Sequence, residues 1–219
     1  MTLFRLDASF RVDGSHSRAV GDVVEAAWTE ANPGEHIVRR HIGTDVIPAT
    51  AWGDAVTAAF VPEDQRTQAQ RDAVALAATL VDELVEADAL LFAVPLFNFG
   101  VSQHFKSYVD LVITDPRMGP GTTTLAGKPT ELVVVRGGNY RAGTPREGWD
   151  HATPWMRRIL ADVWGLDVTV TETDFTLVGT NPALDQFKDM AAEMRAESEE
   201  IARQHGADLS RRRREAAAA

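Results

Sequence analysis

Short apolar runs alternate along the chain with longer segments in which apolar residues recur every three or four positions. Apolar runs of about four to eight residues are typical of buried strands, and the longer spacing is typical of helices packed against a sheet. Strands are expected at residues 3–7, 36–41, 89–94, 130–135 and 168–175. Helices are expected at residues 18–31, 70–86, 102–112, 154–164 and 183–205. Residues 43–68 show no clean periodicity and are expected to form a long connection.

This alternation predicts an α/β protein in which helices cover both faces of a parallel sheet. Five strands suit a flavodoxin-like three-layer sandwich, with strand order 2-1-3-4-5, better than a six-stranded dinucleotide-binding sheet. Residues 1–208 are expected to form a single domain, because no internal repeat or linker interrupts them. Residues 209–219 contain four consecutive arginines and four alanines, and we expect them to be a disordered tail.

Composition narrows the possible chemistry. The 219 residues include no cysteine, so disulfides, thiolate metal sites and iron–sulfur clusters are excluded, and redox chemistry would need an organic cofactor. The net charge of −10 disfavours nucleic acid as a partner, and the histidines lack the spacing of metal ligands. No export signal or long apolar span is visible, so a cytoplasmic protein without membrane contact is expected.

The first candidate loop follows the first predicted strand. Ligands of open α/β sheets bind beyond the carboxyl ends of the strands, which directs attention to this loop and to those after the third and fourth strands. It supplies Ser9, Ser15, His16 and Ser17 where a helix begins, and hydroxyls and free amides at a helix N-terminus suit a phosphate. Ordinary N-capping by serine is the alternative explanation for this loop alone.

The other two loops have different compositions. Leu96, Phe97, Asn98 and Phe99 place two aromatic rings around an amide directly after the central strand, where they could pack a planar heterocycle or form a structural cluster. The segment 135–140 contains paired glycines that would let the backbone approach a ligand, although such a pair can also mark a simple turn. Its last two residues, Asn139 and Tyr140, are candidate substrate contacts.

Taken together, these loops resemble the FMN-dependent NADH-azoreductases, also called NADH:quinone oxidoreductases, of the flavodoxin-like superfamily. The resemblance covers most of residues 1–205, and the P-x-x-N-F element at residues 95–99 is its most specific part. It implies that the phosphate of FMN is bound by Ser9, Ser15, His16 and Ser17. It implies that the isoalloxazine ring is lined by Leu96, Phe97, Asn98, Phe99, Val135, Arg136, Gly137 and Gly138.

The resemblance also implies an activity. Family members transfer two electrons from a nicotinamide donor, here NADH or NADPH, to quinones or azo compounds by a ping-pong mechanism that requires no catalytic side chain. They are homodimers with flavin pockets at the subunit interface, which residues 43–68 and the region of Trp149 would help to cover.

Three departures from the family leave the acceptor open. Val135 stands where the family often has serine, Phe97 where it has tyrosine, and residues 115–124 are rich in glycine and proline. A specialised FMN-dependent reductase of a biosynthetic pathway is one alternative. A flavin-binding electron carrier or redox sensor without its own substrate is another. Residues 121–129 resemble a nucleotide-binding P-loop only superficially. Five residues separate the two glycines instead of four, proline replaces the serine or threonine after the lysine, and the segment precedes a strand.

Overall fold

The computed structural model describes residues 1–119 and 121–218. Pro120, within the loop 115–124, and Ala219, at the end of the expected tail, lie outside the described residues.

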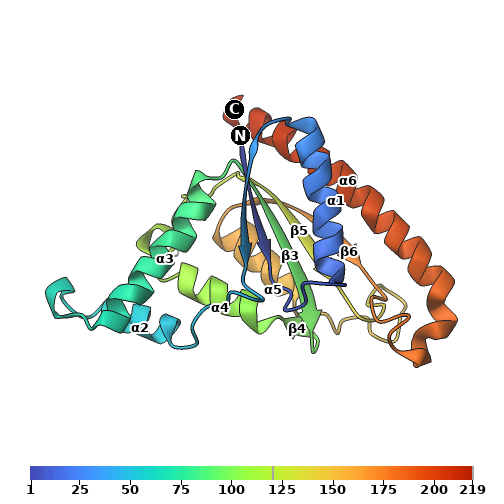
Figure 1. The fold of residues 1–219 in the computed structure, drawn as a ribbon, viewed down its shortest axis with the longest axis horizontal. Helices are drawn as coiled ribbons and strands as arrows, with labels where there is room; N and C mark the ends of the chain where they lie inside the picture. Colours follow the sequence, from blue (N-terminus) through green and yellow to red (C-terminus); the bar gives the residue numbers. More distant parts are fainter. Residues whose placement is uncertain (120, 219) are drawn as a thin grey trace.

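Five parallel strands form the central sheet, in the spatial order β2-β1-β3-β5-β6 (Figure 1). They are β1 (Thr2–Asp7), β2 (His36–His41), β3 (Ala89–Phe97), β5 (Pro129–Val135) and β6 (Asp167–Thr173). Counted along the chain, these five strands have the predicted flavodoxin-like order 2-1-3-4-5. The sheet contains one additional piece that was not predicted, a two-residue strand β4 (Gly100–Val101) that pairs antiparallel with the end of β3.

The position of each strand in the sheet explains its composition. Every residue of β5 is buried, and so are all residues of β3 except the last. A strand covered on both faces is expected to be mostly apolar, which holds for all of β3 and for residues 132–135 of β5. The outer strands β2 and β6 are only partly buried and contain more polar residues.

Helices cover both faces of this sheet, which gives the predicted three layers (Figure 1). One face is covered by α1 (His16–Ala31) and α6 (Lys188–Ala218), which pack against each other. The other face is covered by α3 (Gln68–Glu86), α4 (Gln103–Val112) and α5 (Thr153–Arg157). Short 3₁₀ turns lie at Glu63–Gln65, Pro116–Met118 and Pro182–Phe187.

Two helical segments differ from the expectation. The connection 43–68 contains a helix, α2 (Ala51–Ala58), whose buried face consists of alanines that contribute little to an apolar pattern. The helix expected at residues 154–164 is α5 followed by a π-helical segment, Arg158–Val163. Apolar spacing cannot distinguish these two helix types over so short a stretch.

The C-terminal helix α6 continues to Ala218, so the expectation of a disordered tail from residue 209 is wrong for the described residues. Leu209 is fully buried in the core beneath α1 and α6. Arg212 donates hydrogen bonds to the carboxylate of Asp167 and the hydroxyl of Thr169, both on β6. These contacts hold in helical form a segment that its arginine-rich and alanine-rich composition alone would predict to be disordered.

Gly206 explains why the helix does not end where its sequence suggests. A glycine near the end of an apolar pattern usually indicates a helix terminus. Here a Cβ atom at Gly206 would overlap the carbonyl oxygen of Val24 in α1. The glycine therefore permits the close crossing of α1 and α6 rather than a turn.

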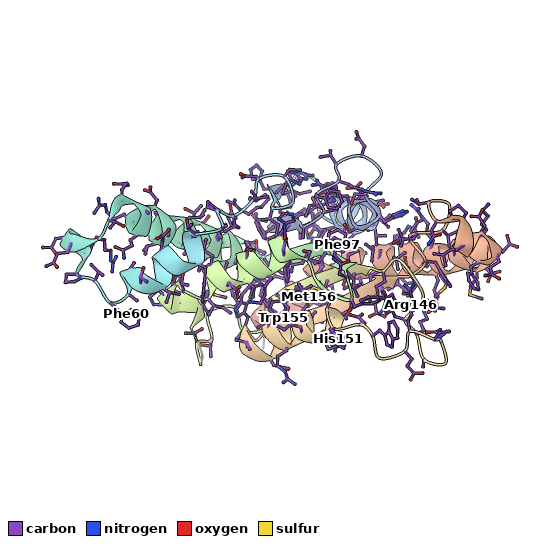
Figure 2. All side chains as sticks on the ribbon, turned by 90° about the horizontal axis from the view of Figure 1, so that it is seen from below. Phe60, Phe97, Arg146, His151, Trp155 and Met156 are labelled. Carbon is purple, nitrogen blue, oxygen red and sulfur yellow. The ribbon has the colours of Figure 1, made fainter. Side chains whose placement is uncertain are left out.

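The two ends of the chain lie at the amino edge of the sheet, and the carboxyl ends of the strands lie at the opposite edge (Figure 1). The carboxylate of Asp88 accepts a hydrogen bond from the backbone of Thr2 and pairs with Arg213, which joins both ends. Figure 2 looks onto the carboxyl edge, with Phe97 near the middle and Phe60 and Arg146 toward opposite ends. Among the described helices, none combines the length and the apolar character that a membrane span requires.

Candidate functional site

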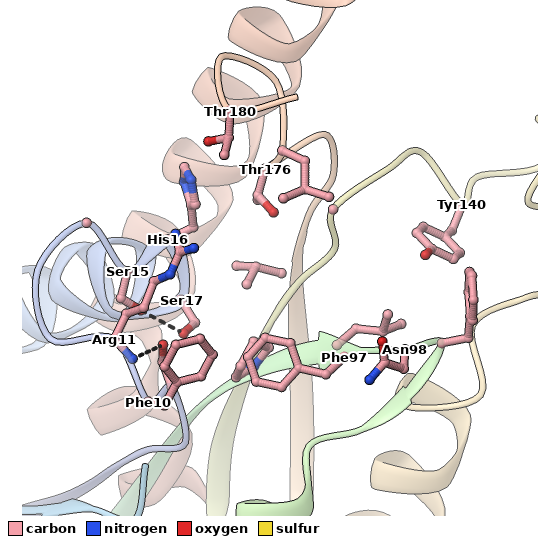
Figure 3. Close-up of a pocket in the computed structure, with 18 of the residues that line it drawn as sticks. Phe10, Arg11, Ser15, His16, Ser17, Phe97, Asn98, Tyr140, Thr176 and Thr180 are labelled. Carbon is pink, nitrogen blue, oxygen red and sulfur yellow. Dashed lines mark hydrogen bonds between the residues drawn. The ribbon is translucent and has the colours of Figure 1, made fainter. Parts of the chain in front are cut away.

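A pocket of about 340 Å³ lies at the carboxyl edge of the sheet, between the loops that follow β1, β3, β5 and β6 (Figure 3). This volume lies within the usual range of small-molecule sites. Its lining comprises Ser9, Phe10, Arg11, Gly14, Ser15, His16, Ser17, Pro95, Leu96, Phe97, Asn98, Phe99, Val135, Gly137, Tyr140, Arg146, Thr176, Leu177 and Thr180. All three loops singled out from the sequence therefore contribute to one pocket.

The loop after β1 forms a serine-rich end of the pocket. Ser15 is the N-cap of α1 and accepts a hydrogen bond from the backbone of Arg18, and its hydroxyl lies 3.3 Å from that of Ser17. The hydroxyl of Ser9 accepts a hydrogen bond from the backbone of Arg11 at 3.2 Å. All three serines are buried while lining the pocket. Hydroxyls and free amides at a helix N-terminus are the elements of an anion site.

The charge of the pocket differs from that of the whole chain. Its described lining includes two arginines, Arg11 and Arg146, together with His16, and contains no Asp or Glu, although the chain has a net charge of −10. Burial lowers the pKa of His16, and the positive charges of Arg195 and Arg11 lower it further. The pocket is thus a region of positive potential on an acidic protein, as an anionic ligand requires.

The turn between β3 and β4 places the aromatic residues. Asn98 and Phe99 both have left-handed backbone angles, with φ values of 49° and 67°, in a two-residue turn between Phe97 and Gly100. Asparagine tolerates this conformation, but it is unfavourable for phenylalanine by about 1–3 kcal/mol. The carbonyl oxygen of Phe99 accepts a hydrogen bond from the backbone of His151, which helps to hold the turn.

The ring of Phe99 packs between two others at the rim of the pocket. Its centroid lies 5.5 Å from that of Trp149 and 6.5 Å from that of Tyr140. Phe97 forms a second contact, with Phe10 of the serine-rich loop, at 5.6 Å. The two predicted aromatics thus form walls of the pocket rather than a closed structural cluster, and 41% of the surface of Phe99 is exposed.

Arg136 has a structural role that the sequence did not indicate. It is almost fully buried, and its guanidinium donates to the carboxylates of Asp174, Glu172 and Asp150 at 2.7–3.1 Å. Burial alone would lower the pKa of Arg136, but these carboxylates raise it above its ordinary value. Its side chain joins the loops after β5 and β6 and does not line the pocket, contrary to its expected contact with the isoalloxazine.

Two further residues of this loop lie outside the pocket lining. Gly138 lies against Arg146, and a Cβ there would be 2.5 Å from the guanidinium nitrogen Nη1. The side chain of Asn139 accepts a hydrogen bond from the backbone of Arg141 and thereby supports the following turn. The remaining predicted residues do line the pocket, including Val135, Gly137 and Tyr140.

Some pocket residues were missed in the sequence. Phe10, Arg11 and Pro95 lie within the loops already identified, next to the predicted residues. The segment 176–180 follows β6, which ends at Thr173 rather than at the expected residue 175. Applying the carboxyl-edge rule to the last strand as well would have found this segment. None of the described residues of 115–124 lines the pocket.

The fold and the pocket together define a flavodoxin-like α/β protein with a serine-rich pocket at the carboxyl edge of its sheet. A family model described as the flavodoxin-like fold matches residues 1–202. The chain belongs to this family, and it is also similar to proteins named FMN-dependent NADH:quinone oxidoreductase.

Two of these relatives come from Frankia. The one from Frankia casuarinae is 34% identical over 204 residues, covering 92% of this chain and 96% of the relative. The one from Frankia alni is 35% identical over 208 residues, covering 94% and 98%. A solved FMN-dependent NADH-azoreductase from Bacillus anthracis, in complex with FMN, has the same fold, with a TM-score of 0.74, 17% identity and coverage of 94% of this chain and all of that one.

Proposed function

We propose that this protein is an FMN-dependent oxidoreductase that transfers two electrons from NADH or NADPH to quinones or azo compounds. The principal observation is the pocket itself, where buried serines at a helix N-terminus lie at one end and exposed aromatic rings at the other, with no acidic side chain in the described lining. The names of the relatives, which include FMN, NADH and quinone, support the same cofactor, donor and acceptor.

The residues of the pocket fit FMN. The hydroxyls of Ser9, Ser15 and Ser17, with the amides at the start of α1, would hold the phosphate. Arg11 adds positive potential, and His16, whose pKa is lowered, offers a ring nitrogen for hydrogen bonding. The unfavourable backbone of Phe99 supports this assignment, because strain of this kind concentrates at functional sites.

The ring of FMN would lie along the turn after β3. Leu96, Phe97, Asn98, Val135 and Gly137, which all line the pocket, would contact it. Bound FMN supplies the hydride-accepting and hydride-donating chemistry, which would operate by a ping-pong mechanism. The protein positions the ring, excludes water with its aromatic walls and stabilises negative charge, so no side chain is assigned as a nucleophile or base.

A C2 homodimer is part of this proposal. Large apolar side chains are exposed on and around α2, namely Val46, Trp52 and Phe60, of which Phe60 is 84% exposed. Exposed apolar patches of this kind favour association. Light scattering of the purified protein, with an expected mass of twice 23.9 kDa, would test this assembly.

A cytoplasmic location remains a prediction from the absence of cysteine.

The cofactor assignment predicts a yellow protein with about one FMN per chain, and the Gly137→Trp variant should lose it. A Cβ at Gly137 would already lie 2.7 Å from Leu177, so an indole there must enter the pocket or displace its wall. The measurement is the flavin absorbance of purified protein and of protein incubated with FMN. Ala26→Trp, which adds the same side chain on the exposed face of α1, should stay yellow. A colourless wild-type protein that does not bind added FMN would refute the proposal.

An electron carrier or redox sensor would share the cofactor pocket but not the reaction with a nicotinamide donor. Anaerobic mixing of the FMN-loaded protein with NADH or NADPH distinguishes the two, because the enzyme should lose its flavin absorbance within seconds. Persistence of that absorbance with both donors would favour the carrier. The specialised reductase was suggested by residues 115–124, and the described residues of this segment do not line the pocket, so they give it no support.

A further inference from the structure

The end of the pocket opposite the serine-rich loop contains an arginine that the proposed cofactor site does not use. Arg146 lines the pocket on the turn between Gly143 and Gly148 and is half-buried. Its Cζ atom lies 5.6 Å from the centre of the Tyr140 ring, and its Nη1 atom is 3.5 Å from the Tyr140 hydroxyl. The guanidinium therefore lies against an aromatic wall of the pocket.

No carboxylate among the described residues forms an ion pair with Arg146. Arg141, five positions earlier on the same loop, pairs with Asp174 and Glu197, and Arg136 pairs with three carboxylates. A guanidinium presents several donors in a planar fork that matches a carboxylate or sulfonate. Apart from the 3.5 Å hydrogen bond from Nη1 to the Tyr140 hydroxyl, the guanidinium donors of Arg146 have no partner among the described residues and remain available to a ligand.

The surrounding backbone is arranged to hold this side chain. Gly138 leaves space for it, since a Cβ at that position would be 2.5 Å from Nη1 of Arg146. The carbonyl of Arg146 accepts a hydrogen bond from Trp149, and the carboxylate of Glu147 accepts one from the backbone of Gly143. These contacts fix the turn that carries the guanidinium.

Aromatic surface and positive charge occur together at this end. Phe99 and Trp149 are both partly exposed, and Tyr140 lies beneath Arg146. A planar aromatic molecule can pack against these rings, and an acidic substituent on it can reach the guanidinium. A neutral molecule of the same shape would use only the rings.

We propose that Arg146 is a specificity-determining residue that selects aromatic acceptors bearing a carboxylate or sulfonate group. The inference rests on the proposed function, because it assigns the acceptor end of the same pocket. It predicts that anionic quinones and azo compounds bind more tightly than their neutral analogues. Because the contact is made in the bound complex before and during the reaction, its loss should raise KM and leave kcat unchanged.

The test compares wild type with Arg146→Gln, using FMN-loaded protein, a saturating nicotinamide donor and two acceptors. The acceptors are 1,4-naphthoquinone-2-sulfonate and the neutral 2-methyl-1,4-naphthoquinone. The variant-to-wild-type ratio of kcat/KM for each acceptor removes the difference in their intrinsic reactivity. We expect about a tenfold loss for the sulfonate through KM, which corresponds to the loss of one charged hydrogen-bond pair, and less than a twofold change for the neutral quinone.

Two variants serve as controls. Arg158→Gln removes one positive charge from an exposed site where Arg158 pairs with Asp162, and it should leave both ratios near one. Arg146→Lys keeps the charge but loses the fork, and it should recover part of the preference for the sulfonate. Methyl red and its methyl ester, which differ by a carboxylate, provide an independent pair of acceptors.

A binding measurement separates this inference from the proposed function. Calorimetric titration of the FMN-loaded protein with the sulfonate, without a donor, should show about a tenfold weaker affinity in Arg146→Gln. Equal losses for charged and neutral acceptors, or a higher KM for the donor alone, would overturn the role of Arg146. Absence of wild-type turnover with the neutral quinone would instead contradict the proposed function, and the titration would still decide the role of Arg146.

Discussion

Gly43 shows how a residue outside the pocket can determine the position of a residue within it. It follows β2, and a Cβ at this position would overlap the carbonyl group of Ser9, whose hydroxyl lines the serine-rich end. The overlap is with backbone atoms, which cannot rotate away as a flexible side chain could. The loop that carries Ser9 would therefore have to shift in any variant with a side chain at position 43.

We expect Gly43→Ala to weaken FMN binding by about tenfold or more, since only about 1.4 kcal/mol of strain in the loop corresponds to a factor of ten. The measurement is titration of cofactor-free protein with FMN, followed by flavin fluorescence. Gly53→Ala is the matched control, because a Cβ there meets nothing within 4 Å and helix α2 should gain about 0.5–1 kcal/mol. An unchanged dissociation constant in Gly43→Ala would show that the loop accommodates the methyl group.

The residues of the site differ in how far the sequence could predict them. Ser15 and Phe97 were found because hydroxyls at a helix start and rings after a buried strand indicate ligand contacts by their local order alone. Arg136 was assigned to the ring by its place in the motif, but its three carboxylate partners come from segments up to 38 residues away. Long-range pairing of this kind is not expressed in local sequence.

At the scale of elements, helix α6 is joined to the sheet by an ion pair between a partly buried histidine and a fully buried glutamate. The carboxylate of Glu131, fully buried in β5, lies 3.1 Å from Nδ1 of His205 on α6. It also accepts hydrogen bonds from the hydroxyls of Thr169 and Thr171. The hydrogen bond to Glu131 raises the pKa of His205 above its usual value of 6.5, against the opposing effect of burial.

This pair predicts a stability that depends on pH. Because the folded protein favours protonated His205, the contribution of the pair is complete below pH 6.5 and is lost as the pH rises through the higher folded-state pKa. We expect the free energy of unfolding to fall by about 1 kcal/mol from about pH 6 to about pH 9. Urea titrations at several pH values give the free energy of unfolding of wild type and of His205→Gln, and the difference between the two proteins measures the contribution of the pair. Identical pH profiles for the two proteins would exclude the pair as its source.

The elements were predicted best where burial dictates composition. β3 and residues 132–135 of β5 are apolar and buried, and strands covered on both faces require apolar side chains of this kind. The extent of α6 was missed because its last turns are ordered by contacts with β6, and because Gly206 resembles a terminator while serving as a crossing point with α1. The alanine face of α2 was missed because alanine contributes little to an apolar pattern.

At the scale of the whole molecule, the pocket and the chain ends lie at opposite edges of the sheet. Removal of residues 211–219 eliminates the contacts of Arg212 with β6 and of Arg213 with Asp88. We expect a loss of about 1 kcal/mol, equivalent to a decrease of about 2–4 °C in the melting temperature. The FMN content should not change, because the pocket lining includes no described residue of this segment. Thermal unfolding measures the loss of stability, and flavin absorbance measures the FMN content. Loss of FMN on truncation would contradict the prediction that the chain ends do not affect the pocket.

The shared contact of both chain ends with Asp88 has a practical consequence. A protein attached to an electrode or a bead through either terminus would be oriented with its pocket directed toward the solution. The choice between an N-terminal and a C-terminal linker would then make little difference to the exchange of small molecules. Attachment through a side chain near the turn at Asn98 would have the opposite result, because the support itself would obstruct the opening.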